Sequence, residues 1–297
     1  MPETRATRDG LRTFDDAVTI VTGGGSGIGA ALGRALAARG ARVVLADRHQ
    51  PGAREEAARL PAGRGEAIGL DVRDARAVEQ AVAGVFERHG RLDYLFNNAG
   101  IAVGGEMSCL SLEDWRDAVD VNLLGPIHGI AAAYPRLVRQ GFGHIVNTAS
   151  MAAFMVTPLA APYGATKGAL VSASRALRLE AARYGVRVSV LCPGVIRTPI
   201  LDAGGRFGRM APNLGPLLDD IRLWERLHPM DADAFARRAL DAVARNRSVI
   251  VIPSWWRAVR ALNGILPSLA ERLASRQLRQ ARELLEAKRG GPAAGAS

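Results

Sequence analysis

The chain has 297 residues and a formal net charge of +10, with 48% hydrophobic and 23% charged residues. This composition is that of a globular protein and excludes a disordered or fibrous chain. The length is compatible with one large α/β domain or with two small domains. All of the 39 basic residues except Lys167 and Lys288 are arginines. They are scattered along the chain without a basic stripe or a zinc-finger spacing, so we expect no nucleic-acid partner.

The sequence carries no signal for secretion. No apolar run reaches the roughly 18 residues that a transmembrane helix needs. Residues 1–15 contain charges but no apolar stretch, so we interpret them as an N-terminal tail and not as a signal peptide. Cys109 and Cys192 are the only cysteines, too few for a disulfide framework. We therefore expect a cytoplasmic protein.

From residue 17 onward, apolar strand-like runs alternate with helical stretches. The predicted strands are Ala17–Thr22, Ala41–Ala46, Glu66–Leu70, Leu92–Asn97, His144–Thr148, Val186–Cys192 and Val249–Ile252. The predicted helices are Gly27–Arg39, a short helix before residue 66, Asp74–His89, Leu112–Leu124 and Pro162–Tyr184. Such alternation favours parallel βαβ units with right-handed crossovers. We therefore predict an α/β fold: a doubly wound, Rossmann-like parallel sheet of about seven strands with helices on both faces.

A glycine-rich segment, TGGGSGIG at residues 22–29, follows the first predicted strand and opens the first predicted helix. Glycine lets the backbone turn tightly and approach a pyrophosphate, whose charge the helix N-terminus stabilises. The flanking strand and helix are the context that a dinucleotide-binding motif requires, although a flexible glycine loop is the alternative. The predicted phosphate-binding residues are Gly23, Ser26, Gly27, Ile28 and Gly29.

An acidic residue, Asp47, ends the second predicted strand. A carboxylate at this place can accept hydrogen bonds from both hydroxyls of an adenosine ribose, and its charge repels a 2′-phosphate. We therefore predict NAD in preference to NADP. The neighbouring Arg48 keeps NADP open, because a guanidinium can pair with that phosphate. A solvated turn residue is the structural alternative for Asp47.

Tyr163 and Lys167 lie four positions apart in a predicted helix, so their side chains share one face. An ammonium group near a phenol favours the phenolate, so we expect the tyrosine pKa to fall from about 10 toward neutrality. Tyr163 would then act as a general acid or base. The alternative is a buried tyrosine beside a surface lysine. Ser150 ends the fifth predicted strand, where its hydroxyl could hydrogen-bond to a substrate oxygen.

Other catalytic chemistries find no support in the sequence. It lacks the G-x-S-x-G turn of a serine nucleophile. Its five histidines follow neither a catalytic-triad pattern nor a metal-ligand spacing. We therefore predict no metal site.

Taken together, these segments resemble the short-chain dehydrogenase/reductase family. The matching segments are TGGGSGIG (22–29), Asp47, LDV (70–72), NNAG (97–100), Asn122 in VNLLG, Ser150, YGATK (163–167) and PGVIRT (193–198). They occur in the order of the family's motifs and cover about residues 17–252. The resemblance implies a single-domain NAD(P)-dependent oxidoreductase that forms a homodimer or homotetramer.

The resemblance also implies roles for individual residues. It implies a catalytic centre of Asn122, Ser150, Tyr163 and Lys167, in which Tyr163 exchanges a proton with the substrate oxygen and Asn122 holds a water in a relay to Lys167. The implied cofactor contacts are Asp71 and Val72 at the adenine, Asn98, Ala99 and Gly100 on the ribose side, Tyr163 and Lys167, and Pro193, Gly194, Ile196 and Thr198 around the nicotinamide.

Residues 199–228 interrupt the alternation, and we interpret them as a substrate lid with glycine hinges. Leu217, Leu218, Ile221, Trp224 and Leu227 have helical spacing there. Apolar residues also follow Ser150, namely Met151, Phe154, Met155 and Val156. We therefore predict a hydrophobic, steroid- or lipid-like substrate. The alternative is that these side chains pack in the core or at a subunit interface.

Residues 253–297 extend beyond the last predicted strand and contain 8 basic and 3 acidic residues. Pro267 and Asn263-Gly264 predict a break between two helices. Apolar residues recur at intervals of three and four: Trp255, Val259, Leu262, Leu266, Leu269 and Leu273. We favour packing of this extension within the molecule or against another subunit. Peripheral membrane contact through residues 253–289 is the alternative.

The leading hypothesis is a catalytic domain over residues 16–252 that interconverts a secondary alcohol and a ketone with NAD(H). One alternative is a ketoreductase that uses NADP(H). Another is a non-catalytic NAD-binding sensor or scaffold, which we would expect to lack the serine, tyrosine or lysine of the catalytic centre. All three are present.

Overall fold

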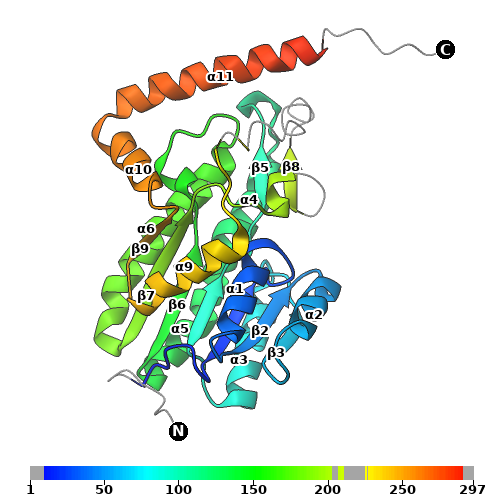
Figure 1. Ribbon diagram of the computed structural model, residues 1–297, viewed down its shortest axis with the longest axis vertical. Helices are drawn as coiled ribbons and strands as arrows, with labels where there is room; N and C mark the ends of the chain where they lie inside the picture. Colours follow the sequence, from blue (N-terminus) through cyan, green and yellow to red (C-terminus); the bar gives the residue numbers. More distant parts are fainter. Residues whose placement is uncertain (1–9, 203–206, 211–224, 226, 290–297) are drawn as a thin grey trace, which may run out of the picture.

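A seven-stranded parallel sheet forms the centre of the protein. The computed structural model describes residues 10–202, 207–210, 225 and 227–289 (Figure 1). The strands of the sheet are β1 (Val18–Thr22), β2 (Arg42–Asp47), β3 (Gly65–Gly69), β4 (Tyr94–Asn97), β6 (Gly143–Thr148), β7 (Val186–Pro193) and β9 (Val249–Ile252). Their order is β3-β2-β1-β4-β6-β7-β9, and every neighbouring pair is parallel. The predicted doubly wound fold is confirmed.

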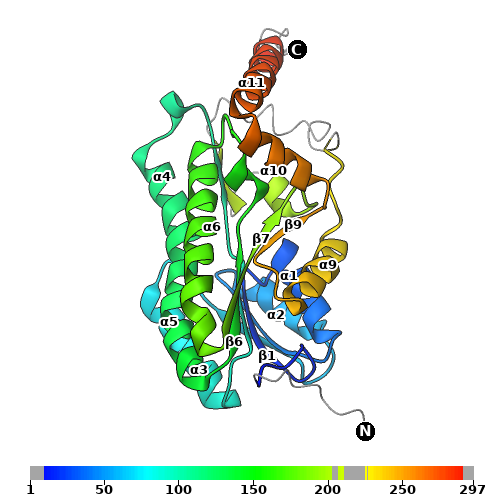
Figure 2. The same cartoon turned by 90° about the vertical axis from the view of Figure 1, so that its left-hand side faces the viewer.

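Helices cover both faces of this sheet, as Figure 2 shows edge-on. One face carries α1 (Gly27–Ala37), α2 (Gln50–Ala58) and α9 (Ala232–Ala244). The other carries α3 (Ala75–His89), α4 (Leu112–Val119), α5 (Gly125–Gln140) and α6 (Ala161–Ala181). Because both faces are covered, the strands are continuous apolar runs, and all five residues of β1 are buried.

The order of the strands reverses between β1 and β4. From β1 the chain builds outward through β2 to β3 and then returns to place β4 on the other side of β1. The loops that follow β1 and β4 therefore diverge at the carboxyl ends of the strands, which leaves a crevice between them. The glycine-rich segment follows β1 and the NNAG segment follows β4, so both predicted binding segments border this crevice.

Two helices depart from the expected elements. The helix predicted over residues 112–124 continues through a π turn (Asp120–Leu124) into α5. The glycines and prolines of α5 hide its helical pattern in the sequence. Pro126 is the second residue after the π turn, and a Cβ at Gly129 would lie 2.2 Å from Asn97 Oδ1, so a larger residue there would collide with the asparagine. The second helix is α9, which lies between residues 228 and 249, where no element is predicted from the sequence.

The predicted lid lies mostly outside the described residues. Of residues 199–228, the structure describes 199–202, 207–210, 225, 227 and 228. Gly208–Met210 forms β8, which pairs in parallel with β5 (Ala102–Gly104) as a separate two-stranded sheet. The lid residues Leu217, Leu218, Ile221 and Trp224 lie outside the described residues.

Residues 10–15, which belong to the N-terminal tail predicted from the sequence, pack against the sheet. Leu11 and Phe14 are buried. The buried Asp93 carboxylate accepts hydrogen bonds from the Arg12 and Val18 backbone N–H groups, and the Tyr94 hydroxyl donates to the Arg12 carbonyl. These contacts extend the folded unit to residue 10 at the amino-terminal side of the sheet.

The extension beyond β9 forms two helices, α10 (Trp256–Ile265) and α11 (Pro267–Arg289), with the break where the sequence predicts it. Figure 1 shows both helices at the end of the molecule opposite the N-terminus. No helix in the described part of the chain is both long enough and apolar enough to span a bilayer.

A buried histidine in β6 makes the fold sensitive to acid. His144 Nε2 lies 2.8 Å from the Ser189 hydroxyl, whose own proton goes to the Arg247 carbonyl at 2.6 Å. Nε2 therefore carries the imidazole proton, and Nδ1 has no hydrogen-bond partner among the described residues. Burial, with smaller contributions from Arg187 and Arg178, lowers the pKa of His144 from 6.5 to about 3.

We predict that His144 contributes to loss of stability as the pH falls from 6.5 toward 3. Unfolded histidine binds a proton in this range and folded His144 does not. The free energy of unfolding therefore decreases as the pH is lowered. Between pH 7.5 and 4.5, wild type should lose roughly 2–3 kcal/mol more than His144→Gln, which keeps an amide donor for Ser189. Urea unfolding at the two pH values measures this difference. Equal losses would show that His144 is not the group responsible.

Candidate active site

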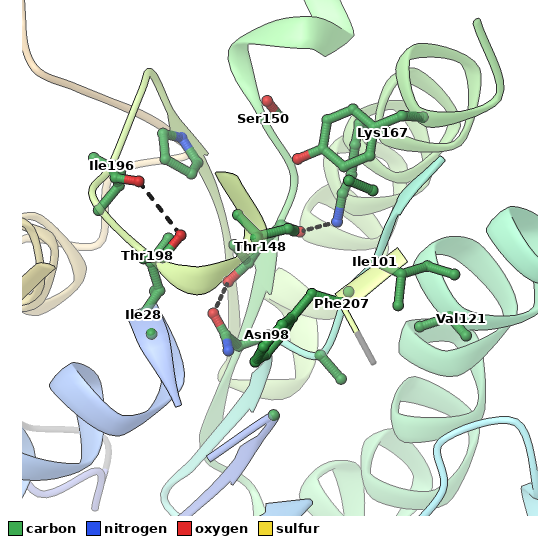
Figure 3. A pocket seen from close by; sticks show the side chains of 18 of the residues that line it. Ile28, Asn98, Ile101, Val121, Thr148, Ser150, Lys167, Ile196, Thr198 and Phe207 are labelled. Carbon is green, nitrogen blue, oxygen red and sulfur yellow. Dashed lines mark hydrogen bonds between the residues drawn. The ribbon is translucent and has the colours of Figure 1, made fainter. Parts of the chain in front are cut away.

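A cavity of about 440 Å³ lies at the carboxyl ends of the strands and joins the predicted binding segments (Figure 3). At one end it is lined by the loops after β1, β2 and β4. At the other it is lined by the start of α6, the loop after β6 and the loop after β7. The dinucleotide motif and the tyrosine–lysine pair, which are far apart in the sequence, therefore share one cavity.

The glycine-rich loop after β1 packs closely against the loop after β4 and the end of β2 and lines the cavity. Gly23 has φ +66°, and a Cβ there would lie 2.9 Å from Ala99 Cα. A Cβ at Gly25 would lie 3.0 Å from the Asp47 carboxylate. Ser26 precedes α1 without making a side-chain capping hydrogen bond, and the first turn of α1 has no acidic residue. This helix N-terminus is thus suited to an anion, and the loop fits a dinucleotide pyrophosphate.

Asp47 lies beside this loop at the end of β2. Its carboxylate accepts hydrogen bonds from the Gly25 N–H at 3.0 Å and the His49 N–H at 2.8 Å. The side chain is therefore held in place and still lines the cavity. Arg48 is exposed and also lines the cavity. Asp71 pairs with Arg73 at 2.6 Å, and mainly for this reason its pKa is lowered.

Hydrogen bonds from Thr22 hold the loop after β4 against the end of β1. The Thr22 hydroxyl oxygen accepts from the N–H groups of Asn98 and Ala99, and the Asn98 side chain donates to the Thr22 carbonyl at 3.1 Å. Thr148 of β6 donates to Asn98 Oδ1 at 3.3 Å (Figure 3). Asn98, Ala99 and Gly100 are thereby fixed along the floor of the cavity.

Lys167 is a buried cation at the centre of the cavity wall. Its ammonium group donates to the Thr148 carbonyl at 3.0 Å (Figure 3) and lies 5.6 Å from the centre of the Tyr163 ring. Burial lowers the pKa of Lys167 from 10.5 to about 8. The side chain is therefore mostly charged at neutral pH and places a positive charge beside the phenol.

The state of Tyr163 differs from the sequence expectation. Burial raises the pKa of Tyr163, and the interaction with the Ser150 hydroxyl lowers it by less. The prediction that Lys167 brings this pKa below 10 fails in the structure, because desolvation of the phenolate outweighs the effect of nearby groups. Tyr163 is therefore protonated at neutral pH in the structure. Ser150 lines the same cavity.

Two predicted site residues do not line the cavity, namely Gly29 and Asn122. Gly29 lies inside α1, where a Cβ would lie 2.0 Å from the Gly23 carbonyl, so it permits the close packing of the loop. Asn122 is buried in the π turn, and its amide exchanges two hydrogen bonds of 2.9 Å with the Ile101 backbone. A Cβ at Gly100 would lie 3.2 Å from Asn122 Oδ1 and 3.3 Å from Lys167 Nζ, so both side chains adjoin Gly100 where a Cβ would point.

The loop after β7 closes the cavity from the side of α1. Pro193, Gly194, Ile196 and Thr198 all line it. The backbone of Gly27 approaches Thr198 so closely that a Cβ would lie 3.3 Å from the threonine side chain. The glycine-rich loop and the PGVIRT segment thus border the same space.

The far end of the cavity is apolar, and sequence reasoning missed several of the residues there. Ser150 is followed by Met151 and Met155, which line the cavity as expected. The lining residues outside every predicted segment are Ile101 and Val103, and Trp256 comes from the C-terminal extension. Leu201, Phe207 and Met210 lie in the segment predicted as a lid, and Val121 precedes Asn122 in VNLLG. Val103 and Met210 lie on the paired strands β5 and β8, and Trp256 begins α10; neither the strand pairing nor the docking of α10 has a sequence motif.

Trp256 carries the C-terminal extension into the cavity wall. Its indole packs on Gly194, where a Cβ would lie 2.0 Å from the indole Nε1. On α10, the Arg260 guanidinium lies 4.4 Å from the centre of the Phe154 ring. The glycine of the Pro193-Gly194 pair therefore provides the space that the tryptophan occupies.

Within the described residues, no group of three His, Cys, Asp or Glu side chains could hold a metal ion. At the end of the cavity beside α6, the side chains able to donate or accept a proton include the Tyr163 phenol, the Ser150 hydroxyl and the Lys167 ammonium. Such groups can transfer a proton to or from an oxygen and stabilise its charge.

A parallel sheet with a dinucleotide cradle and a neighbouring tyrosine–lysine pair defines a nucleotide-dependent oxidoreductase. The family model described as short chain dehydrogenase matches residues 17–205. The chain therefore belongs to the short-chain dehydrogenase/reductase family.

Named relatives include oxidoreductases with known substrates. Meso-2,3-butanediol dehydrogenase of Serratia marcescens is 41% identical over 185 residues, which are 62% of this chain and 73% of the relative. A solved structure of a short-chain dehydrogenase/reductase from Burkholderia phymatum, in complex with NAD, matches with a TM-score of 0.78 and 30% identity and covers 87% of this chain and 96% of its own. A 3-ketoacyl-(acyl-carrier-protein) reductase from Brucella melitensis, complexed with NADH, matches with a TM-score of 0.69 and 27% identity over 80% of this chain and 97% of its own.

We predict that Gly194 and Trp256 are energetically coupled. Gly194→Ala should destabilise the protein by about 1–3 kcal/mol, because the new methyl group collides with the indole. In the double variant with Trp256→Ala, the cost should be clearly less than the sum of the two single costs. Urea unfolding of the four proteins measures the coupling. Gly264→Ala, where a Cβ would meet no atom within 4 Å, is the control, and additive costs for the main pair would contradict the predicted contact.

Proposed function

We propose that this protein interconverts a secondary alcohol and a ketone with NAD(H) as cofactor. The observation that carries the proposal is that one cavity joins the glycine-rich loop of a dinucleotide site to Ser150, Tyr163 and Lys167. A substrate held beside the cofactor would therefore lie within reach of Ser150, Tyr163 and Lys167. We further propose that residues 16–252 form the catalytic domain, that the protein acts in the cytoplasm and that it is a homodimer or homotetramer.

Tyr163 is proposed as the group that gives a proton to the carbonyl oxygen and takes one from the alcohol. Its raised pKa keeps it protonated at neutral pH, which suits the reduction direction. The Lys167 charge would stabilise the phenolate that forms when the proton leaves. Ser150 would hydrogen-bond to the substrate oxygen and hold it near the phenol. Alkaline pH should favour alcohol oxidation, because Tyr163 must then accept a proton.

Asn122 is proposed to act from behind this centre. Its two hydrogen bonds to Ile101 fix the backbone beside Gly100, and the Asn122 amide oxygen and Lys167 Nζ both lie close to the position that a Cβ at Gly100 would take. By fixing the Ile101 backbone, the Asn122 amide would help to hold a water molecule beside Lys167, and this water would exchange protons with the lysine.

The cofactor-binding residues proposed from the sequence fit a dinucleotide. The loop with Gly23, Ser26, Gly27 and Ile28 would hold the pyrophosphate, and Asp71 and Val72 the adenine. Asn98, Ala99 and Gly100 would contact the ribose side, and Ile196 and Thr198 the carboxamide. Bound NAD(H) would supply the hydride that moves to or from the substrate carbon. The structures of two relatives contain NAD or NADH, which supports this choice.

Asp47 supports NAD over NADP. Its carboxylate is held beside the loop by two backbone N–H groups, where it can accept hydrogen bonds from ribose hydroxyls and repel a 2′-phosphate. Arg48 favours the alternative, a ketoreductase using NADP(H), because its exposed guanidinium lines the same part of the cavity.

The substrate is proposed to be hydrophobic. Methionine, leucine and phenylalanine side chains line the far end of the cavity, where Trp256 also lies. The names of two relatives refer to a small diol and to a carrier-bound ketoacyl group. The family resemblance alone therefore does not indicate the size of the substrate. Apolar lining favours steroid- or lipid-like alcohols and ketones over small diols.

We predict that Tyr163→Phe folds and binds NADH but loses catalysis. Turnover of a panel of secondary alcohols and ketones, hydroxysteroids included, should fall about 10²–10⁴-fold, the usual worth of a general acid or base. NADH absorbance measures turnover, and NADH fluorescence measures binding. Tyr134→Phe, in α5 and away from the cavity, is the matched control. A rate above roughly a tenth of wild type in Tyr163→Phe would exclude the proposed proton transfer. If wild type binds NADH but turns over no compound of the panel, the result would favour the alternative of a non-catalytic NAD-binding sensor or scaffold.

We predict that wild type prefers NAD and that Asp47→Asn weakens this preference. The variant keeps the side-chain shape and one acceptor but loses the charge. The ratio of kcat/KM for NAD to that for NADP should fall about 10–100-fold, as expected for hydrogen bonds to a charged group. Asp241→Asn, on the exposed face of α9, is the charge-matched control. A wild type that prefers NADP, together with an Arg48→Ala variant that loses NADP turnover, would establish the alternative.

A further inference from the structure

Half of the exposed large hydrophobic side chains in the described residues gather in the C-terminal helices. Trp255, Ile265, Leu266, Leu269 and Leu273 are between 41% and 76% exposed, and they lie within 19 residues of one another in the sequence. Single exposed apolar side chains are ordinary, but such a cluster marks an interaction surface. We define these five residues as the apolar stripe of the C-terminal helices.

On α11 the stripe has a cationic border. Leu269 and Leu273 are four residues apart and so share one face of the helix, and Leu266 directly precedes its first residue, Pro267. Arg272 and Arg276 follow Leu269 and Leu273 by three residues each, and Arg279 continues the same row. The three arginines are exposed, and none forms an ion pair with another described residue. On the opposite border, Ala270 and Ala274 are buried.

The stripe is connected to the substrate end of the cavity. Trp255, which is 48% exposed, stacks on Trp256 with 4.4 Å between the ring centres, and Trp256 lines the cavity. Figures 1 and 2 show α10 and α11 at the carboxyl end of the sheet, with α11 as the outermost element there. The Arg282–Glu106 ion pair of 2.7 Å ties α11 to the segment after β5. The stripe therefore belongs to the cavity end of the molecule.

We propose that the apolar stripe and its arginine border dock the protein on an anionic lipid bilayer. Leucines, isoleucine and tryptophan would enter the interface between headgroups and acyl chains, and the arginines would pair with anionic headgroups. The charges complement this partner, because residues 253–297 hold 8 basic and 3 acidic residues. A second copy of the chain fits less well, because antiparallel pairing of two such stripes brings the same borders together and arginines would face arginines.

Docking would place the cavity beside the bilayer. This consequence rests on the proposed hydrophobic substrate, since an apolar alcohol or ketone would then be taken from the lipid. The docking itself does not depend on activity, so vesicle binding and turnover can fail separately.

Vesicle flotation tests the proposal with the full-length protein. Wild type should float with phosphatidylcholine vesicles that contain about one third phosphatidylglycerol, and not with phosphatidylcholine alone. Binding should weaken at about 0.5 M NaCl, where charges are screened. Because the whole protein has a net charge of +10, binding by wild type alone is not sufficient, and the variants decide.

The paired variant Leu269→Asp, Leu273→Asp tests the stripe. Both side chains are more than two-fifths exposed, so the fold should persist, as unfolding temperature and NADH binding can verify. Vesicle partitioning should fall about tenfold or more. Leu179→Asp on α6, where the leucine is 81% exposed, is the control and should bind like wild type.

A triple variant tests the border. Arg272, Arg276 and Arg279 changed to Gln should reduce partitioning by about 100-fold, since each basic residue near an anionic surface contributes about 1 kcal/mol. Changing Arg237 and Arg238 on α9 and Arg245, which directly follows α9, to Gln removes the same charge elsewhere and should have a much smaller effect.

Three results would overturn the proposal. The first is that wild type does not float with anionic vesicles. The second is that the aspartate pair floats as well as wild type, which would show that net charge alone causes the binding. The third is a dimer in sedimentation equilibrium that the aspartate pair converts to monomer while neither protein floats, which would make the stripe a subunit contact.

Discussion

The site depends on how two loops are joined where the strand order of the sheet reverses. β1 and β4 are neighbours, but the chain leaves them in opposite directions. The hydroxyl of Thr22, at the end of β1, accepts two backbone hydrogen bonds from residues 98 and 99 after β4. The crevice that results is bounded by the glycine-rich loop on one side and by Asn98 to Gly100 on the other. Parallel strands make such a crevice at their carboxyl ends, and the cavity continues from there to Tyr163.

Burial determines the chemistry of the other half of the cavity. The pKa of Lys167 is lowered to about 8 and that of Tyr163 is raised, because both charged forms lose water in the same wall. At neutral pH the Tyr163 phenol is protonated and can donate a proton. The nearby Lys167 ammonium is charged and can stabilise the phenolate that remains. Neither shift follows from the four-residue spacing, which shows only that the two groups lie on the same side of a helix.

In this chain the C-terminal helix α10 contributes to the wall of the cavity at the carboxyl end of the sheet. Trp256 fills the space above Gly194 and becomes part of the cavity wall, while its neighbour Trp255 remains largely exposed. One short helix thereby has one side in the candidate active site and another at the surface. The extension is thus part of the site's architecture, and the exposed leucines of α11 begin where this helix ends.

Local patterns in the sequence determined the alternation of strands and helices, the glycine-rich loop, Asp47 at the end of β2 and the pairing of Tyr163 with Lys167. These features are encoded in contiguous residues, so spacing alone predicts them. Tertiary structure decided the rest. The glycines and prolines of α5 hide a helix whose Gly129 is required by contact with Asn97. The packing of Trp256 on Gly194, the lining by Phe207 and the raised pKa of Tyr163 depend on residues brought together from distant segments, because close packing and desolvation are properties of the surroundings and not of the local chain.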